Sequence, residues 1–445
     1  MTLYDDTLEL LQELIRNACV NDLTADSGFE VRNADSLERF FVGSGVEVQR
    51  FEPHPHRTSI IFTVPGDPDK EPLTFLGHTD VVPVDADKWT KDPFAAVIED
   101  GKLYGRGAVD MLFITATMAA VTREVARRGN PGGTLTFAAL ADEEARGGLG
   151  ARWFERENPG AINWKNCLSE TGGSHLPGGV AVIVGEKGAA QRRIHVHGDA
   201  GHGSTPYNKD FAIVKIGEVA RRIAEANLPI ANDPIWQGFR ESFKFDPESE
   251  KLIDSGDFSP FGNLSAFAHA FSHTTISQTV LRAGGAINVL PSHAYLEMDI
   301  RPLPGQTQNE VDEMLRDAIG DIDVEIEHLI NEDATVSPTT GPLWDTLVET
   351  VGEFFPGKDV VPTLATGGSD LRVARRLGGV GYGFALHAPE RDLATANAEL
   401  HSHDECLHLE DLELTVQAYA RVTEKFLGME LAVNSKFAQT PGEAE

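Results

Sequence analysis

Cysteine is scarce in this sequence, with Cys19, Cys167 and Cys406 as the only three among 445 residues. An odd and widely spaced set excludes a disulfide framework, and the lack of a Cys-x-x-Cys pair argues against a thiolate zinc site. Few cysteines are typical of proteins kept in a reducing compartment. We therefore expect a cytoplasmic location.

Long hydrophobic runs and basic residues are also in short supply. No apolar run reaches the roughly 18 residues that a membrane-spanning helix needs. The first segment, MTLYDDTLELLQELIRN, is typical of an amphipathic helix rather than a signal peptide. Because 69 acidic residues stand against 38 basic ones, the net charge is −31. Nucleic acid and anionic membranes both attract basic faces, so we expect neither as a partner.

What the first 180 residues do contain is an alternation of short apolar runs with helix-like segments. Alternation of this kind predicts an α/β domain with a mostly parallel sheet covered on both faces. The strands are expected at Thr58–Val64, Leu73–Leu76, Thr134–Leu140 and Asn166–Leu168, and the helices near Thr7–Asn17, Glu30–Val42, Met111–Arg128 and Leu149–Glu157.

The pattern changes after Gly185, where strand-like segments alternate polar with apolar residues. This alternation indicates half-exposed antiparallel strands, and with a helix at Phe211–Ala226 it predicts an inserted α/β sandwich. The stretch Pro229–Thr274 is less regular. We expect a discontinuous catalytic domain at 1–186 and 302–430, an inserted domain at 187–301, and a loose polar tail at 431–445.

Several ionisable residues directly follow the predicted strands or precede helices. The carboxyl ends of parallel strands gather functional groups at one edge of a sheet. Each residue alone has a simpler interpretation, as a helix cap, a first-turn acid or a hydrogen-bonded core histidine. Together their nitrogen and oxygen ligands suit two metal ions about 3.5–4 Å apart that share a carboxylate. The residues are His78, Asp110, Glu143, Glu144, Glu170 and His401.

Seven motifs occur in one order between about Leu73 and Glu405: HTDVVP, GRGAVDM, DEE, SETGG, GHGS, GGAINVLP…DIRPLPG and LHSHDE. In this order they resemble the di-zinc aminoacylase/carboxypeptidase family, which includes acetylornithine deacetylase, succinyl-diaminopimelate desuccinylase, aminoacylases and glutamate carboxypeptidases. The resemblance implies a zinc-peptidase catalytic domain with a mostly parallel sheet, and an inserted α/β sandwich that serves as lid and dimerisation domain.

The resemblance also implies a ligand set. One zinc would take His78 and Glu170, the other would take Glu144 and His401, and Asp110 would bridge the two. The implied cofactors are therefore two Zn²⁺ ions, for which Co²⁺ or Mn²⁺ could substitute.

Two further roles follow from the same motifs. Glu143 matches the general base, and Asp80 matches the carboxylate that orients the first histidine. Residues two apart on a strand share a face, so Asp80 can reach the ring of His78, and a ligating imidazole needs an acceptor for its second N–H. A cis peptide is implied between Asp110 and Met111.

In the inserted domain, His202 matches a histidine that reaches across a homodimer to stabilise the reaction's oxyanion. Asn288 and Arg301 match a pair that grips the substrate carboxylate and carbonyl, for which arginine offers a two-pronged fork. Their simpler interpretations are a strand turn and a surface ion pair. Gly368 and Ser369, in the loop TGGSD, match a substrate-contacting loop. One departure is Leu112, where the family commonly has lysine after the Asp-Met pair.

We expect a metal-dependent hydrolase that cleaves an amide or peptide bond next to an amino acid with a free carboxylate. Its substrate would be an N-acyl amino acid or a short peptide. One alternative is a biosynthetic deacylase resembling acetylornithine deacetylase or succinyl-diaminopimelate desuccinylase. A more remote alternative is an inactive binding protein on the same fold.

Overall fold

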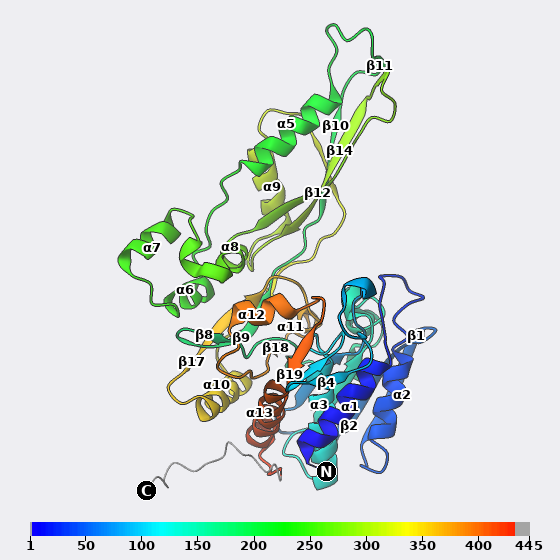
Figure 1. The fold of residues 1–445 in the computed structure, drawn as a ribbon, viewed down its shortest axis with the longest axis vertical. Coiled ribbons are helices and arrows are strands. Elements are labelled where there is room, and N and C mark those ends of the chain that lie inside the picture. The colour runs from blue at the N-terminus through cyan, green and yellow to red at the C-terminus, as the bar shows by residue number, and fades with distance from the viewer. Residues whose placement is uncertain (1, 432–445) are drawn as a thin grey trace.

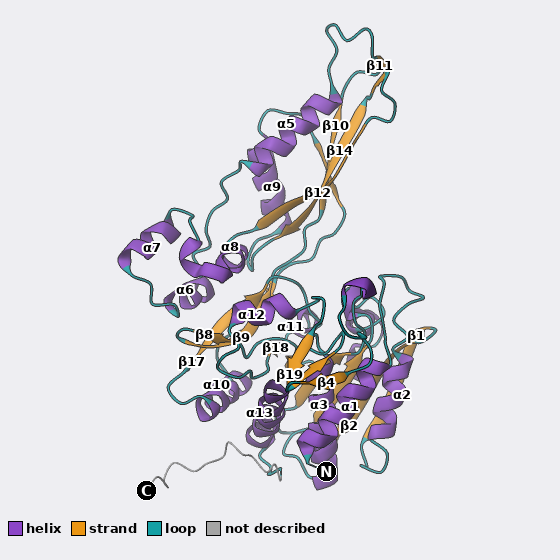
Figure 2. Cartoon of the chain, viewed as in Figure 1, coloured by secondary structure: helices purple, strands orange, loops and turns teal. Residues whose placement is uncertain are grey.

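The computed structural model describes residues 2–431, which form a broad lower body and a narrow upper arm (Figure 1). The final part of the predicted loose tail, residues 432–445, lies outside the described residues. Strands occupy the centre of the body and helices surround them (Figure 2). Within the described residues, no helix is both long enough and apolar enough to cross a membrane.

The body is built on a ten-stranded sheet whose central strands run parallel, as the sequence predicted. Each central strand is buried on both faces, which explains its continuous apolar run. The strand order is β1 (Glu47–His54), β2 (Arg57–Val64), β6 (Leu135–Leu140), β3 (Leu73–His78), β7 (Asn166–Ser169), β18 (Val380–Gly383), β9 (Gly179–Glu186) and β16 (Thr335–Val336), with β17 (Asp359–Ala365) and β8 (His175–Leu176) also paired to β9.

Helices cover both faces of this sheet. Alternate residues of β3 point to opposite sides, so that Phe75 enters one core and Leu76 the other. The larger core is closed by α1 (Leu3–Arg16), α2 (Val31–Phe40), α3 (Leu112–Arg128), α10 (Pro342–Phe354) and α13 (Leu409–Leu427), and the smaller by α4 (Ala151–Glu157) and α11 (Leu371–Arg376).

The upper arm contains the predicted α/β sandwich. Its antiparallel sheet has the order β12 (Thr275–Ala283), β14 (His293–Arg301), β10 (Arg192–His197) and β15 (Glu325–His328), and it packs against α5 (Ala212–Ala224) and α9 (Gln308–Ile319). The sheet therefore continues past residue 301, where the sequence placed the end of the inserted domain. The sequence missed this because α9 and β15 resume a helix–strand alternation that also fits the body.

The stretch Pro229–Thr274, expected to be irregular, is largely helical. It contains α6 (Pro234–Glu241), α7 (Pro247–Asp254) and α8 (Ser265–Ser272), and a 3-10 segment at Ser259–Leu264. Asp233 and Asp246 cap α6 and α7, each followed by proline at the first helical position. These caps are the sequence signal that was missed. The helices pack their aromatic side chains against β9 and β17 of the body.

The remaining elements are short. A three-stranded sheet of β19 (Cys406–His408), β5 (Lys102–Tyr104) and β4 (Val97–Glu99) lies beside the body, and β11 (Gly201–His202) pairs with β13 (Val289–Leu290) at the tip of the arm. The helix α12 (Leu393–Glu399) lies between the body and α8 (Figure 1). Further 3-10 turns occupy Ala86–Lys88, Glu143–Ala145 and Pro159–Ala161.

Candidate metal centre

Three parallel strands deliver ionisable side chains to one edge of the large sheet. His78 is the last residue of β3, Glu143 and Glu144 form a 3-10 turn just after β6, and Glu170 directly follows β7. Two other segments close on the same edge, with Asp110 ahead of α3 and His401 ahead of β19. The structure therefore brings together all six residues that the sequence singled out.

Asp110 lies between the two histidines. Its Oδ1 is 3.2 Å from Nε2 of His78, and its Oδ2 is 3.1 Å from Nε2 of His401. A carboxylate that turns one oxygen toward each imidazole has the geometry of a bridging ligand. The peptide bond between Asp110 and Met111 is cis, in agreement with the expectation.

The other carboxylates approach the same histidines. Glu170 Oε2 is 3.5 Å from Nε2 of His78, and Glu144 Oε2 is 3.6 Å from Nε2 of His401. Ligand atoms of His78, Asp110 and Glu144 lie within 4.8 Å of one another, and so do those of His78, Glu143 and Glu170. Both sets include His78, so the side chains form one continuous cluster around Asp110 and His78.

The electrostatics of the cluster favour the binding of positively charged ions. Hydrogen bonds to Asp110 and then Glu144 raise the pKa of His401 to about 10. Burial, followed by the charge of Asp110, raises the pKa of Glu170 to about 8. Within residues 2–431, the salt bridges of Asp110, Glu144 and Glu170 are all to the two histidines.

One carboxylate oxygen gives a direct test of whether a metal fits. Oε1 of Glu144 is buried and has no hydrogen-bond partner among the described residues. Such an atom costs free energy unless a ligand satisfies it. Hard oxygen and imidazole donors of this kind suit zinc and similar divalent ions, so the residues fit a metal centre.

Asp80 contacts the centre in two ways. Its main-chain carbonyl, rather than its carboxylate, lies nearest to Nδ1 of His78, at 3.0 Å against 3.7 Å. The buried carboxylate instead accepts hydrogen bonds from the main-chain N–H groups of Glu143 and Glu144, at 3.2 and 3.1 Å, and from the side chain of Asn21 at 2.8 Å. Asp80 therefore fixes both the imidazole of His78 and the turn that carries the two glutamates.

A buried glutamate that the sequence analysis missed holds the loop of Asp110. Oε1 of Glu405 accepts from the N–H groups of Val109 and Asp110, at 2.7 and 3.2 Å. Oε2 accepts from the guanidinium of Arg106, which also donates to the carbonyl oxygen of His401. The loops of Asp110 and His401 are thus tied together. The place of Glu405 at the end of the LHSHDE motif was the available signal.

A second missed group lies behind the turn of Glu143. Asp142 has a left-handed backbone with φ of 69°, and its carboxylate accepts from Arg57 at 2.6 Å. The same guanidinium donates to Glu30, and all three side chains are buried. They come from distant segments, so only the folded chain reveals them.

The metal centre opens into a cavity of about 900 Å³. Arg301, Gly368 and Ser369, predicted to contact substrate, all line it. Apolar side chains from α3, α8 and α12 line another part, among them Phe113 and Phe267. Glu143, Glu170 and Asp370 also line it, and Oδ2 of Asp370 is buried without a hydrogen-bond partner among the described residues.

The loop of Gly368 is held tightly against an arginine. A Cβ atom at Gly368 would lie 1.5 Å from the guanidinium of Arg372, whereas one at Gly367 would meet nothing within 4 Å. Ser369 donates to Glu186 from its main-chain N–H at 2.9 Å and from its hydroxyl at 2.6 Å. The hydroxyl of Ser369 is therefore already engaged within the protein.

The structure does not bring His202 and Asn288 to this cavity. His202 lies in β11 at the tip of the arm, far from the body (Figure 1), where its Nδ1 is 2.8 Å from the hydroxyl of Ser204. Asn288 is its neighbour there, because its carbonyl oxygen accepts from the N–H of Gly203 at 2.8 Å.

Leu112, the departure from the family pattern, is buried in the large core. It packs beside Gly107, where an added Cβ would lie 2.9 Å from Cδ1 of Leu112. The residue supports the loop of Asp110 by packing, and a leucine suits this place.

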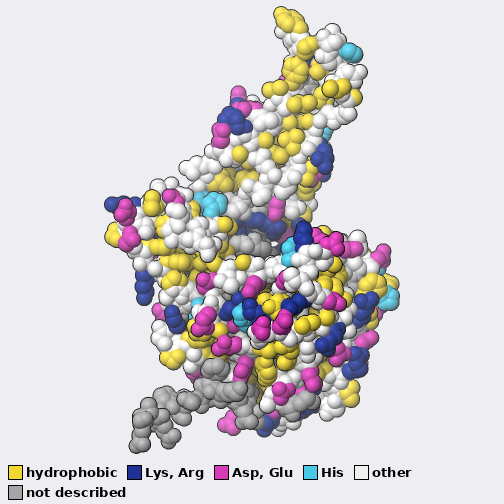
Figure 3. All heavy atoms as spheres, in the orientation of Figure 1, with side chains coloured by type: hydrophobic (Ala, Val, Ile, Leu, Met, Phe, Trp, Pro, Cys, Tyr) yellow, Lys and Arg dark blue, Asp and Glu magenta, His cyan; other side chains and the backbone are white. Residues whose placement is uncertain are grey.

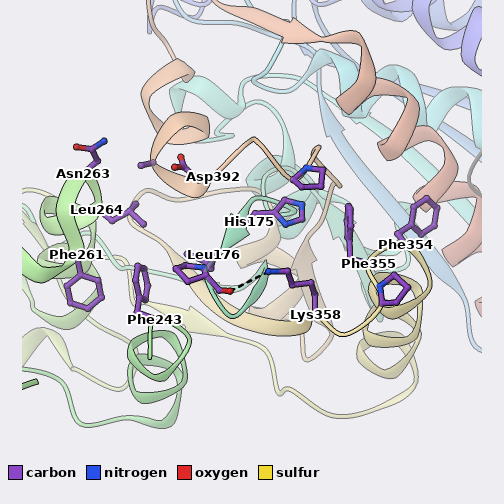
Figure 4. Close-up of a pocket in the computed structure, with 14 residues that line it drawn as sticks. His175, Leu176, Phe243, Phe261, Asn263, Leu264, Phe354, Phe355, Lys358 and Asp392 are labelled. Carbon is purple, nitrogen blue, oxygen red and sulfur yellow. Dashed lines mark hydrogen bonds between the residues drawn. The ribbon is translucent and has the colours of Figure 1, made fainter. Parts of the chain in front are cut away.

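A second cavity, of about 590 Å³, is lined in part by Asp392, the residue that caps α12 (Figure 4). Phe243, Phe261 and Phe355 line it together with His175 and Lys358. It shares Asn263, Leu264 and Ala394 with the cavity of the metal centre, so these residues separate the two. The aromatic residues of Pro229–Thr274 therefore have two roles. Phe243 and Phe261 line this cavity, whereas Trp236 and Phe239 are buried in the core.

Comparison with known proteins gives consistent matches along most of the chain. A model of the peptidase family M20/M25/M40 matches residues 74–425. A succinyl-diaminopimelate desuccinylase of Rhodospirillum centenum is 27% identical over 443 residues, covering 96% of this chain and 98% of the relative. The mouse protein named N-fatty-acyl-amino acid synthase/hydrolase PM20D1 is 28% identical, covering 71% of this chain and 67% of that protein.

Among solved structures, the metallo-carboxypeptidase Sso-CP2 of Sulfolobus solfataricus superimposes with a TM-score of 0.72. The match covers 96% of this chain and 100% of that one, at 15% sequence identity. This likeness concerns the fold.

Proposed function

The chain belongs to the peptidase family M20/M25/M40 and is a metal-dependent hydrolase of amide or peptide bonds, and on this premise we propose that it cleaves N-acyl amino acids or short peptides with a free carboxylate. The observation that carries the proposal is the shared cavity. Ligand carboxylates, the further glutamate Glu143 and Arg301 all line the same 900 Å³ space. Hydrolysis of such a substrate needs all three together.

The metal centre would be held by His78 and Glu170 on one side and by Glu144 and His401 on the other, with Asp110 between them. We propose two Zn²⁺ ions, with Co²⁺ or Mn²⁺ as substitutes. When bound, such ions polarise a carbonyl and lower the pKa of a bound water toward about 7. The short approaches of Asp110 to both histidines support this assignment.

Glu143 would act as the general base. It lines the cavity beside Glu170, and burial together with the charge of Glu170 raises the pKa of its carboxyl well above the ordinary value. A base of raised pKa takes a proton readily and can pass it to the leaving amine. Asp80 would position Glu143 through the hydrogen bond to its main-chain N–H.

Arg301 would bind the carboxylate of the leaving amino acid. It lines the cavity, and its Nε donates to Asp299 at 3.0 Å, so its terminal nitrogens remain available for a two-pronged contact. Gly368 would allow the substrate a close approach to the loop, and Ser369 would contact substrate through the backbone that Glu186 holds.

His202 and Asn288 would complete the site of a partner subunit in a homodimer. Their distance from the metal centre of their own chain supports a role in trans (Figure 1). The arm carries hydrophobic side chains along its length (Figure 3). Among them Val214, Leu281 and Ile287 are 66%, 46% and 106% exposed, and β12 is an edge strand that could pair with another chain.

A second candidate is a biosynthetic deacylase, which the near full-length similarity to a desuccinylase supports. An inactive binding protein is disfavoured because the base and four of the ligands line one cavity, and the fifth ligand, His78, contacts Asp110. We also propose a cytoplasmic location, supported by three free cysteines that are all buried. The net charge of −31 supports a small molecule, and neither nucleic acid nor membrane, as the partner.

The test is turnover of a panel of N-acetyl, N-succinyl and long-chain N-acyl amino acids and dipeptides. The protein is first treated with a chelator and then supplied with zinc. We expect hydrolysis of at least one class, lost on chelation and restored by the metal. Glu143→Gln should retain its metals and lose turnover by about 10²- to 10⁴-fold. Unchanged turnover in this variant, or in the chelated protein, would refute the proposal.

A further inference from the structure

Five arginines line the metal-centre cavity together with its carboxylates, although the chain as a whole carries a charge of −31. Two of its arginines are committed to internal pairs, because Arg152 and Arg372 both contact Glu332. Arg301 pairs with Asp299 at 3.0 Å. Arg391 pairs with Glu399 and Asp411. The fifth arginine, Arg146, differs from these four.

Arg146 directly follows the turn that carries Glu143 and Glu144. Its main-chain N–H closes that turn by donating to the carbonyl oxygen of Glu143 at 2.7 Å. Its side chain is exposed and lines the cavity. Within residues 2–431 this side chain makes no hydrogen bond and no salt bridge.

The backbone of Arg146 lies in the left-handed region, with φ of 75° and ψ of 18°. This conformation disfavours residues with a Cβ atom and favours glycine. Glycine occupies the next position, Gly147, which has φ of 66°. An arginine at 146 is thus a costly choice for the fold, which points to a function of its side chain.

The charges around Arg146 are of both signs, because Glu332 and Asp299 lie near it as well as Arg301 and Arg152. Loss of solvation inside the cavity lowers its pKa, Arg301 and Arg152 lower it further, and Glu332 and Asp299 oppose this change. Glu332 is already shared between Arg152 and Arg372. Asp299 is likewise paired with Arg301, so neither acid forms a salt bridge with Arg146, and the guanidinium of Arg146 can take an anion that enters the cavity.

We propose that Arg146 is a specificity-determining residue that binds a second carboxylate of the substrate, so that the enzyme prefers amides of glutamate or aspartate. This inference rests on the proposed function, in which Arg301 takes the α-carboxylate. Arg146 then takes the side-chain carboxylate of the same leaving amino acid. Hydrolysis adds one water across the amide and releases the acyl acid and the acidic amino acid.

The layout of the cavity assigns this carboxylate to the leaving amino acid rather than to the acyl group. Arg146 and Arg301 are electrostatic neighbours near the base of the arm. The surface supplied by α8 and α12 is largely apolar, with Phe267, Ala270 and Ala396 lining the cavity. An acyl group suits that surface, and an acidic amino acid suits the pair of Arg146 and Arg301.

The experiment compares three substrates that differ in whether they carry an additional carboxylate and in where it lies. N-acetyl-glutamate and N-acetyl-glutamine have nearly the same shape, and only the former has a charged side chain. N-succinyl-glutamine carries its extra carboxylate on the acyl group. Each is assayed with the zinc-loaded wild type, Arg146→Gln, Arg146→Gly and the control Arg127→Gln, which removes an exposed arginine at the distant end of α3.

We expect the wild type and Arg127→Gln to prefer N-acetyl-glutamate over N-acetyl-glutamine. Both Arg146 variants should lower kcat/KM for N-acetyl-glutamate by about 10- to 100-fold, the range of a charge-assisted hydrogen bond, and leave N-acetyl-glutamine unchanged. Arg146→Gly should also match or exceed the wild type in Tm, because glycine suits the left-handed backbone.

Three results would overturn the proposal. Equal losses on both acetyl substrates would indicate a structural role, and a loss confined to N-succinyl-glutamine would place the second carboxylate on the acyl side. Equal kcat/KM values of the wild type for N-acetyl-glutamate and N-acetyl-glutamine would also contradict the proposal. Failure of the proposed function itself is distinct, since the wild type would then hydrolyse none of the amides in the panel.

Discussion

At the scale of single residues, the site depends on how Asp110 is shared by two imidazoles. His401 is half exposed, with 48% of its side chain accessible, and it is held by carboxylates on two sides. His78 is buried, and despite that burial its pKa is raised by Asp110 and Glu170. Without metal, the imidazole of His401, whose pKa is raised to about 10, therefore carries a second proton at neutral pH.

This protonation predicts that zinc binding releases protons. The pKa of His401 is raised to about 10 in the metal-free protein, and a ligating imidazole must be neutral. Calorimetry at pH 7.5 in buffers of different ionisation enthalpy should detect at least about one proton released per chain. The release should decline as the pH rises through about 10, the pKa of His401. His401→Gln should release fewer protons, and the absence of any release in the wild type would contradict the assignment.

The contact between His401 and Asp110 also affects the stability of the metal-free protein. Because the folded pKa of His401 lies above its ordinary value of 6.5, its contribution is complete below about pH 6.5 and is lost as the pH rises through about 10. The expected result is a Tm of the chelated protein that decreases over this window.

At the scale of elements, the strand ends were predictable and the turns between them were not. The apolar runs of β3, β6 and β7 and the acids behind them were visible in the sequence, because buried parallel strands have continuous apolar runs. The helices α6 and α7 were missed, although Asp-Pro pairs mark both of their starts. Glu30 and Arg57 were missed because their contacts join segments distant in sequence.

The turn after β6 gives a matched pair of glycine variants. A Cβ atom at Gly150 would lie 1.7 Å from the carbonyl oxygen of Ala141, just ahead of the turn, whereas one at Gly148 would have an ordinary contact at 3.6 Å. Gly150→Ala should therefore displace Glu143 and Glu144 and weaken zinc binding by about 10- to 100-fold, as losses of supporting contacts do.

Gly148→Ala serves as the control and should bind zinc like the wild type. Circular dichroism checks that both variants are folded, and competition with a chromogenic chelator measures their affinities. Equal zinc affinities in the two folded variants would show that the turn tolerates displacement.

At the scale of the whole molecule, the separation of the arm from the metal centre is the dominant feature (Figure 1). The sequence predicted an inserted sandwich and placed its end at residue 301, and the structure extends its sheet to β15. His202 and Asn288 lie together at the far end of this arm. In a single chain, the metal centre is therefore far from His202 and Asn288, although the proposed site includes all of them.

If His202 acts in trans, two inactive variants should restore activity when combined. Mixed dimers of His202→Ala and Glu143→Gln contain one site with both residues intact. With random assortment, half of the dimers are mixed and one of their two sites works, so about a quarter of wild-type turnover is expected. The subunits are exchanged by dilution and reconcentration before the assay. No recovery in dimers that have exchanged subunits would place His202 outside the reaction.

The central claim is that a pair of metal ions in this carboxylate and histidine cluster supports hydrolysis. The most direct measurement is the zinc content per chain, determined by elemental mass spectrometry, during titration of the chelated protein while turnover is followed. We expect turnover to rise with bound zinc and to reach its maximum at about two ions per chain, the number that adjacent bridged positions hold. Full turnover in protein that contains no transition metal would contradict the account.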